Sequence, residues 1–427
     1  MAFTTVRSAT GVDFIGTPGV DIGVIFDETG NVTLSGLGDA DVIQVNNSTT
    51  IQRTSSVNGG DGADQITFST SISDSSVNGN KGADTIAVFG SVANSFVGGG
   101  EGSDNIFGGT QYLSSYIEGG AGSDIITVAK NLALATINGG DGNDTINSPA
   151  LLPGESLLLN SSSINGNAGN DIINLSSLNI TVSGANFIGG GAGDDTINFF
   201  GTTTDGLAGV FSKGFDLIGG SGNDIINGSA ENDAIWGNAD NDTITGGKGT
   251  DTIYAGAGND RINAEFDLIT GGLGADDYVL VPGPGTSSFF INAVAESAAA
   301  TSGTVRTFDS FVPYSGFVPG DILNISAVTN QLAGGLYTGG VTAATSSNLG
   351  AVGAFASFAD LQASLNLGNY LASDTGTIRT YNFNATIAGA VGNYLWIQDS
   401  QSAYTSSDLL FQTKNLGSIP VGQIVLA

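Results

Sequence analysis

The chain has 427 residues, a formal net charge of −30, and neither cysteine nor histidine. Without cysteine there are no disulfides, iron–sulfur clusters or thiol nucleophiles, and without histidine the commonest general base and zinc ligand is missing. Nucleic acids and anionic membranes are bound by clusters of lysine and arginine, whereas residues 1–280 hold 33 acidic and only 7 basic side chains. We therefore expect a chain that attracts cations and does not bind nucleic acid.

A phrase of glycines, then aspartate, then a branched apolar residue recurs from the N-terminal end onwards. "GTPGVDIG" and "GLGDADVI" are loose copies that contain Asp21 and Asp41. Stricter copies such as "GGDGADQI" then follow every 20 residues, with their aspartates at Asp64, Asp84, Asp104, Asp124 and Asp144. Self-similarity at a fixed period is typical of solenoids, in which each repeat stacks on the next.

The period changes further along the chain. Copies at Asp171, Asp195 and Asp224 are separated by insertions such as "SPALLPGES". Nine-residue repeats then occupy residues 219–262, with aspartates at Asp233, Asp242, Asp251 and Asp260, and "GGLGADDY" ends the series at Asp276. Since two nine-residue units make one coil, we expect alternate aspartates on opposite sides: Asp224, Asp242 and Asp260 on one, Asp233 and Asp251 on the other.

Two columns of apolar residues accompany the aspartates. Two positions after the aspartate stand Ile43, Ile66, Ile86, Ile106, Ile126, Ile146, Ile173, Ile197 and Ile226. Seven positions before it stand Leu34, Val57, Val77, Val97, Ile117, Ile137, Ile164, Ile188 and Leu217. Each copy therefore predicts a turn between short strands whose branched side chains share one face. The fold class we predict is all-β: a right-handed parallel β-roll or β-helix, with these columns as its core.

The spacing of coils suggests why the aspartate recurs. Neighbouring strands lie about 4.8 Å apart, and Ca²⁺ binds oxygen at about 2.3–2.6 Å, so an ion between two stacked turns reaches both. Glycines allow the turn to direct main-chain carbonyl groups at that point. A column of carboxylates without a counter-ion would be repulsive, whereas Ca²⁺ would make it cohesive. We therefore predict several Ca²⁺ ions, each held by consecutive coils.

The predicted metal site comprises one aspartate per copy and glycines of the same turns. Sites near Asp233 and Asp242 are expected to be weaker, because glycine positions there hold Ser229, Glu231 and Asp240. Exposed Asp61 and Asp141 are expected to be solvated, with a supporting metal role left open. The predicted ligands are Asp41, Asp64, Asp84, Asp104, Asp124, Asp144, Asp171, Asp195, Asp224, Asp233, Asp242, Asp251, Asp260 and Asp276, with Gly60, Gly62, Gly220, Gly222, Gly247 and Gly249.

These phrases resemble the RTX (repeats-in-toxin) nonapeptide GGxGxDxUx, a calcium-binding β-helix repeat. The resemblance covers roughly residues 11–279 and is sharpest at "GGSGND", "GGKGTD" and "AGAGND". It departs from the family pattern in the 20-residue spacing, which predicts calcium loops on mainly one edge and plain turns such as "STSISD" and "GTQYLSS" on the other. We accordingly divide the chain into a solenoid, 1–279, and a C-terminal domain, 280–427.

The C-terminal domain lacks the repeat. Its segments 308–328 and 393–413 are similar to the closing region of RTX proteins, which caps the roll and carries an uncleaved signal for type I secretion. No apolar run reaches the ~18 residues of a membrane span, and no N-terminal signal peptide is visible. The resemblance thus implies a secreted, extracellular or cell-surface protein that does not insert into membranes. A short helix is predicted at "SFADLQASLN", and short strands elsewhere.

Three functions from different classes remain open. The first is a non-enzymatic structural protein, rigidified by Ca²⁺, that self-associates in a surface layer, matrix or filament. The second is an adhesion or attachment protein, cellular or viral, that binds a glycan or polysaccharide through the plain-turn edge or the cap. The third, a polysaccharide-acting enzyme, is disfavoured because the carboxylates serve the calcium ladder and the few basic residues form no groove for an acidic sugar. A nucleotide-binding loop is also disfavoured, since such loops occur once and with basic support.

Overall fold

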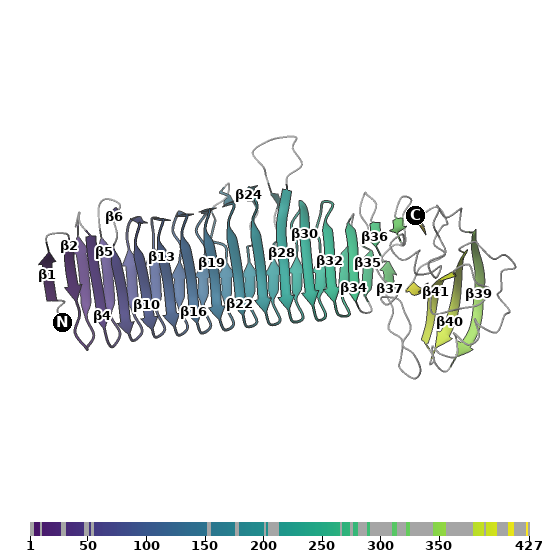
Figure 1. Cartoon of the computed structure of the whole chain (residues 1–427), viewed down its shortest axis with the longest axis horizontal. Helices are drawn as coiled ribbons and strands as arrows, with labels where there is room; N and C mark the ends of the chain where they lie inside the picture. Colours follow the sequence, from purple (N-terminus) through teal and green to yellow (C-terminus); the bar gives the residue numbers. More distant parts are fainter. Residues whose placement is uncertain are drawn as a thin grey trace, which may run out of the picture. The chain divides into compact units, whose positions relative to one another are not determined.

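The computed structural model describes much of the repeat region and, beyond it, separate strands. The described residues are 4–8, 11–26, 31–46, 51–52, 55–151, 155–175, 179–199, 202–203, 213–264, 267–273, 276–280, 288–290, 310–313, 322–324, 345–355, 379–387, 390–398, 409–413 and 424–425. Within these ranges every regular element is a strand (Figure 1). None of the described residues forms a helix long and apolar enough to cross a membrane. The all-β prediction is confirmed, and the helix predicted near Ser357 lies outside the described residues.

The chain divides into two compact units, Met1–Asn232 and Asp233–Ala427. In the first unit the strands form three sheets, and most coils contribute one strand to each. The first sheet contains β2 (Gly11–Ile15), β4 (Asn31–Leu37), β7 (Ser56–Asp61), β10 (Ser76–Lys81), β13 (Phe96–Glu101), β16 (Tyr116–Ala121), β19 (Thr136–Asp141), β22 (Ser163–Ala168), β25 (Phe187–Ala192) and β28 (Lys213–Ser221). Strand β1 (Thr4–Ser8) pairs with β2 and runs antiparallel to it.

The second and third sheets complete each coil of the first unit. The second contains β3 (Ile22–Phe26), β5 (Val42–Asn46), β8 (Gln65–Phe68), β11 (Thr85–Val88), β14 (Asn105–Phe107), β17 (Ile125–Thr127), β20 (Thr145–Asn147), β23 (Ile172–Asn174), β26 (Thr196–Asn198) and β29 (Ile225–Asn227). The third contains β6 (Ile51–Gln52), β9 (Ile72–Ser73), β12 (Ser91–Ala93), β15 (Gln111–Leu113), β18 (Asn131–Ala133), β21 (Leu157–Asn160), β24 (Asn179–Ser183) and β27 (Thr202–Thr203). Consecutive coils pair in parallel throughout these sheets.

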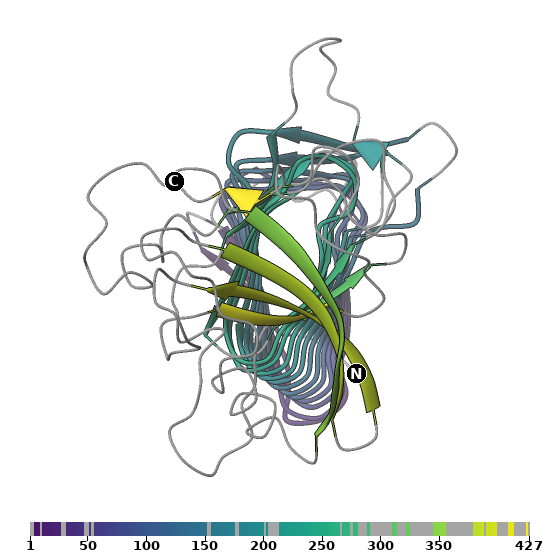
Figure 2. The same cartoon turned by 90° about the vertical axis from the view of Figure 1, so that its right-hand side faces the viewer.

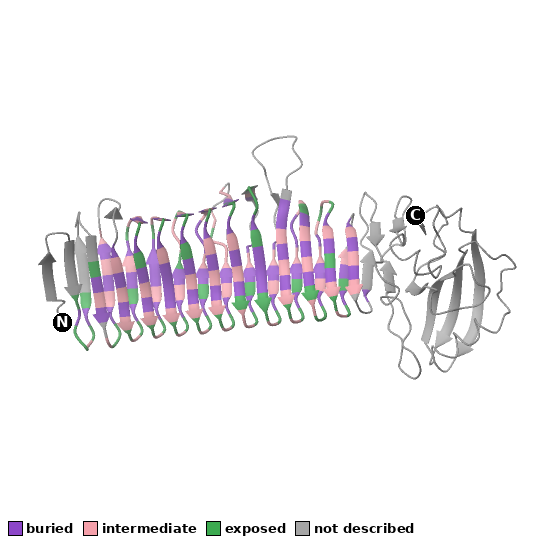
Figure 3. Ribbon diagram, viewed as in Figure 1, coloured by how far each residue is buried: buried purple, intermediate pink, exposed green. Residues whose placement is uncertain are grey.

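The register of the sheets follows the repeat. Val77 of β10 lies opposite Val57 and Val97, and Ile86 of β11 lies opposite Ile66 and Ile106. Along most strands buried and less buried residues alternate, as expected when successive side chains point to opposite faces (Figure 3). Every member of the two predicted apolar columns is buried, with at most 1% of its surface exposed. These columns form the core, as the sequence predicted.

The third sheet was not predicted. The supposed plain turns "STSISD" and "GTQYLSS" contain strands β9 and β15, so the 20-residue coil has three sides. The extra side encloses large aromatic side chains, among them Phe68 and Tyr112, which are almost fully buried. These short strands were missed because two or three residues carry too little alternation to reveal a strand.

A serine column closes the edge between the third and first sheets. The amide of Ser75 donates to Ser95 Oγ at 3.0 Å, and the amide of Ser95 donates to Ser115 Oγ at 3.2 Å. The Oγ of Ser95 in turn donates to the carbonyl of Ala93 at 2.6 Å. These buried hydroxyls therefore satisfy main-chain amides that no sheet partner reaches.

The second unit continues the repeat with coils of two strands. They are β30 (Asn232–Ala239), β31 (Thr243–Thr245), β32 (Thr252–Ala257), β33 (Arg261–Ala264), β34 (Leu268–Leu273) and β35 (Asp277–Leu280). Ile235 pairs with Ile253, and Ile244 with Ile262, so these coils are 18 residues long. The following coil is shorter, since Ile253 pairs with Ile269.

Strands without the glycine–aspartate repeat follow in the same unit. They are β36 (Ser288–Phe290), β37 (Ser310–Pro313), β38 (Ile322–Asn324), β39 (Thr345–Phe355), β40 (Arg379–Ile387), β41 (Ala390–Gln398), β42 (Leu409–Thr413) and β43 (Ile424–Val425). Strand β39 pairs with β40 in parallel, whereas β40–β41 and β41–β42 are antiparallel, and Figure 2 shows β39–β41 side by side. The predicted strand-rich region after residue 280 is thus seen in its described parts.

Candidate calcium site

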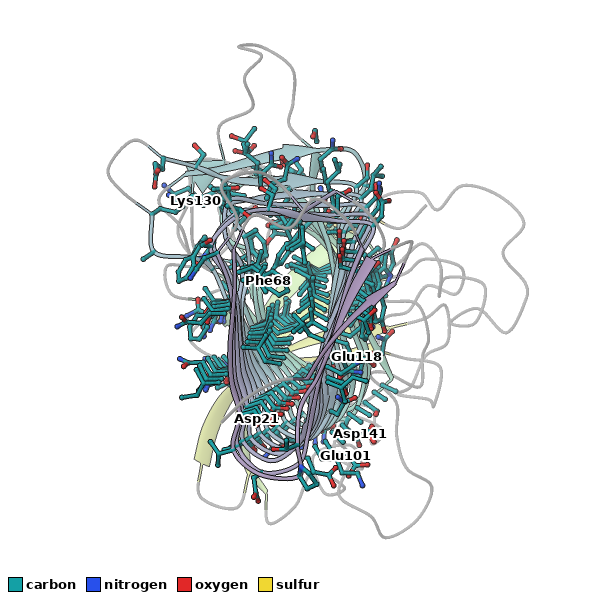
Figure 4. The ribbon with its side chains drawn as sticks, turned by 90° about the vertical axis from the view of Figure 1, so that its left-hand side faces the viewer. Asp21, Phe68, Glu101, Glu118, Lys130 and Asp141 are labelled. Carbon is teal, nitrogen blue, oxygen red and sulfur yellow. The ribbon has the colours of Figure 1, made fainter. Side chains whose placement is uncertain are left out.

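The aspartates of the repeat form one continuous column in the first unit. The amide of Asp64 donates to Oδ1 of Asp84, and that of Asp84 donates to Oδ1 of Asp104, both at 2.7 Å. Figure 4 shows Asp21, the first member, pointing inside the coil, whereas Glu101 and Asp141 point outwards. The same bond joins each successive pair among Asp21, Asp41, Asp64, Asp84, Asp104, Asp124, Asp144, Asp171, Asp195 and Asp224.

Glycine conformations make the turn before each aspartate possible. Gly62 has φ +126°, and a Cβ there would collide with the main chain of Asp39 in the preceding coil. A side chain at this position would therefore be both strained and too close to its neighbour. The predicted site glycines all adopt positive φ: Gly60, Gly62, Gly220, Gly222, Gly247 and Gly249.

The second carboxylate oxygen, Oδ2, lies inside the turn. It is buried and accepts no hydrogen bond from the protein in Asp41, Asp64, Asp84, Asp104, Asp124, Asp144, Asp171, Asp195, Asp251 and Asp260. A buried carboxylate oxygen without a partner is costly, so a repeated set of them calls for a ligand. These atoms are the strongest indication that the turns hold cations.

A main-chain oxygen of the next coil lies close to many of these atoms, from Asp41 to Asp171. The position that a Cβ on Gly59 would occupy touches Asp64 Oδ2 and lies 2.7 Å from the carbonyl oxygen of Gly79. The same relation holds for Gly166, where the carbonyl oxygen of Gly190 lies 2.6 Å from that position and Asp171 Oδ2 touches it. A carboxylate oxygen of one coil and a carbonyl oxygen of the next thus border one small space, and such hard oxygens fit Ca²⁺.

This geometry refines the expectation that carboxylates from two coils clasp one ion. Within the described residues, no group of three or more acidic side chains converges on a single point. One carboxylate oxygen, Oδ1, is already engaged by the amide of the preceding coil. Because Ca²⁺ takes six to eight oxygens, main-chain carbonyl groups and water would have to supply the remaining ligands.

Burial alters the acidity of the column. It raises the pKa of Asp64 and Asp104 to about 6 and that of Asp84, Asp144 and Asp195 to about 7, with neighbouring carboxylates adding to the rise and the backbone hydrogen bond opposing it. A bound cation would reverse this effect, because a nearby positive charge favours the ionised carboxylate. The electrostatics of the metal-free column are therefore unfavourable near neutral pH.

The second unit has two columns, as the nine-residue spacing predicted. The amide of Asp242 donates to Asp260 Oδ1 and that of Asp260 to Asp276 Oδ1, both at 2.9 Å. On the other side the amide of Asp233 donates to Asp251 Oδ1 at 2.8 Å. At positions where the repeat lost glycine, Asn238 and Asp240 adopt positive φ, 81° and 73°, so the turn keeps its shape.

Two members of the columns, Asp267 and Asp21, were not among the ligands predicted from the sequence. Asp267 accepts the amide of Asp251 at 3.2 Å, and its repulsion, second only to burial, raises the pKa of Asp251. It was overlooked because no glycine pair precedes it, although Ile269 two residues later marks the same phrase. Asp21 was aligned with the repeat but omitted from the predicted ligands, and it lies in the column of the first unit. Asp61 and Asp141 are exposed, as expected.

Comparison with protein families agrees with this geometry. The model of the RTX calcium-binding nonapeptide repeat, in four copies, matches residues 136–148, 161–178, 181–199, 218–253 and 236–266. No curated protein matches the chain significantly. RTX nonapeptide repeats bind calcium, and several copies imply several ions. The chain therefore contains calcium-binding repeats of the RTX type.

Proposed function

We propose that this protein is an extracellular structural protein, exported by type I secretion, whose solenoid is rigidified by Ca²⁺ and assembles in a surface layer, matrix or filament. The observation that supports it best is the column of buried Oδ2 atoms without protein partners. Because each coil completes the site of its neighbour, ion binding and coil stacking reinforce one another. Such a protein would be stiff only where calcium is abundant.

The chemistry of the chain supports a structural role over a catalytic one. The repeated carboxylates are already committed to hydrogen bonds along the column through Oδ1. The chain also has no histidine or cysteine to act as base or nucleophile, and only ten lysines and arginines. A solenoid that repeats one calcium site from coil to coil suits a load-bearing or scaffolding task.

The calcium site can be tested with paired neutral substitutions. In Asp104→Asn with Asp124→Asn, the amide oxygen can still accept the main-chain bond, but two charged ligands are lost. We expect calcium-induced folding, followed by circular dichroism, to require several-fold more calcium than in the wild type, and more than in either single variant. Asp61→Asn with Asp141→Asn removes the same charge from exposed positions and should titrate like the wild type. Identical titrations for all these variants would contradict a shared site.

An adhesive role is the second candidate. Phe89 and Leu134 are the most exposed large apolar residues described, and both lie beside the third sheet rather than at the calcium turns. Such side chains could contact a cell-surface glycan. Electron microscopy of the purified protein with and without Ca²⁺ separates the two roles: ordered sheets or filaments support assembly, whereas calcium-folded monomers that bind glycan support adhesion.

A further inference from the structure

The outer face of the second sheet in the first unit carries no charge over six consecutive strands, β14, β17, β20, β23, β26 and β29. We call it the uncharged face. Its first column consists of Asn105, Ile125, Thr145, Ile172, Thr196 and Ile225, and its second of Phe107, Thr127, Asn147, Asn174, Asn198 and Asn227. This is notable in a chain whose net charge is −30.

Isoleucine and threonine alternate along the first column. Ile125, Ile172 and Ile225 are 43%, 45% and 45% exposed, and Thr145 and Thr196 lie between them in register. With coils about 4.8 Å apart, the isoleucines recur roughly every 9.6 Å. Each therefore projects beside a threonine that leaves room for an apolar side chain from another surface.

We propose that the uncharged face binds the same face of a second copy of this chain, shifted by one coil so that the isoleucines of each copy contact the threonines of the other. This inference rests on the proposed assembly and names the surface through which it occurs. Burial of the isoleucines supplies the apolar contribution. The second column adds amide groups: Asn227 Nδ2 donates to Asn198 Oδ1 at 2.8 Å, and such stacked amides pair well between sheets.

The alternation of isoleucine and threonine favours a second copy as the occupant, because the same column shifted by one coil matches it, and the lack of charge favours this face as the contact. The first sheet carries Glu118 on its outer side, and the neighbouring turn edge exposes Asp61, Glu101 and Asp141. Two such surfaces would repel each other. Two aromatic rings of the first sheet, Phe96 and Tyr116, stack on each other with centroids 5.8 Å apart. An acidic chain can approach its own copy most closely where neither bears charge.

Charge placed on the uncharged face tests the proposal. Ile125→Asp, Ile172→Asp and Ile225→Asp are combined in one variant, and the control variant combines Leu113→Asp, Leu158→Asp and Phe187→Asp, which are 37%, 38% and 38% exposed on the other two sheets. Both variants add the same charge. In Ca²⁺, with folding checked by circular dichroism, we expect light scattering to show assembly of the first variant only at concentrations tenfold or more above the wild type, and near-normal assembly of the control. Equal assembly of the two variants would overturn the proposal.

A site-specific label provides a test that does not depend on a disruptive substitution. Because the chain has no cysteine, Ile172→Cys and, as control, Leu158→Cys can each carry a single nitroxide. On assembly the label at 172 should lose mobility, whereas that at 158 should keep it. A mobile label at 172 in assembled protein would overturn the proposed face while leaving the proposed function intact. Wild-type protein that stays monomeric in Ca²⁺ would instead contradict assembly itself.

Discussion

The coils of the two units are stabilised by different contacts. Coils of the first unit have three sides, one aspartate column, a serine column and buried aromatic residues such as Tyr112. The described coils of the second unit, from Asp233 to Asp276, have two strands each and an aspartate column on both sides. The shorter coil thus encloses less apolar volume and gathers more carboxylates. We therefore expect dependence on calcium to be greater in the second unit, where the core is smaller.

Removal of calcium should have the largest effect, and an unequal one. With excess chelator, we expect residues 233–273 to lose amide protection against hydrogen exchange before residues 56–147, because two unneutralised columns destabilise a smaller core. Hydrogen exchange followed by mass spectrometry measures both segments in one sample. Simultaneous loss of protection in both segments would contradict a greater calcium dependence of the second unit.

The pH dependence of the metal-free chain should be the next largest effect. The folded-state pKa of Asp64 is raised to about 6 and that of Asp84 to about 7, from 3.8. The folded chain therefore holds protons that the unfolded chain has lost, so its stability is greatest below pH about 4 and falls as the pH rises through 6–7. Urea unfolding in chelator at pH 5 and pH 8 tests the sign. Greater stability at pH 8 would contradict it.

Substitution of one buried aromatic residue should have the most local effect, a destabilisation confined to the first unit. Tyr112→Ala removes a fully buried ring from the third side of the first unit and should cost about 3–5 kcal/mol of unfolding free energy. Leu113→Ala changes the adjacent, exposed residue and should cost far less. Protection of residues 233–273 should be unchanged in both variants. A loss there equal to that in the first unit would show that the two units unfold together.

Much of this architecture could be predicted from the sequence because every repeat places the same residue types at the same offsets. Ile66 and Val77 are buried where the period placed them, and the two aspartate columns of the second unit followed from spacing alone. The third sheet could not be predicted, since Ile72–Ser73 is too short to show a pattern. The different surroundings of the two carboxylate oxygens could not be predicted either. Oδ1 accepts a hydrogen bond from an amide of the preceding coil, whereas Oδ2 lies close to a carbonyl oxygen of the next coil, as for Asp64.

The strict register of the first unit has a consequence for its length. The bonds from a main-chain amide to a side chain in the serine and aspartate columns join consecutive coils, and between Ser75 and Ser95 or Asp64 and Asp84 the partners are 20 residues apart. Deleting residues 76–95 as a block would therefore bring each remaining group opposite an equivalent partner. We therefore expect the part of the first unit with 20-residue coils to tolerate the loss or gain of whole coils, because both columns keep their register.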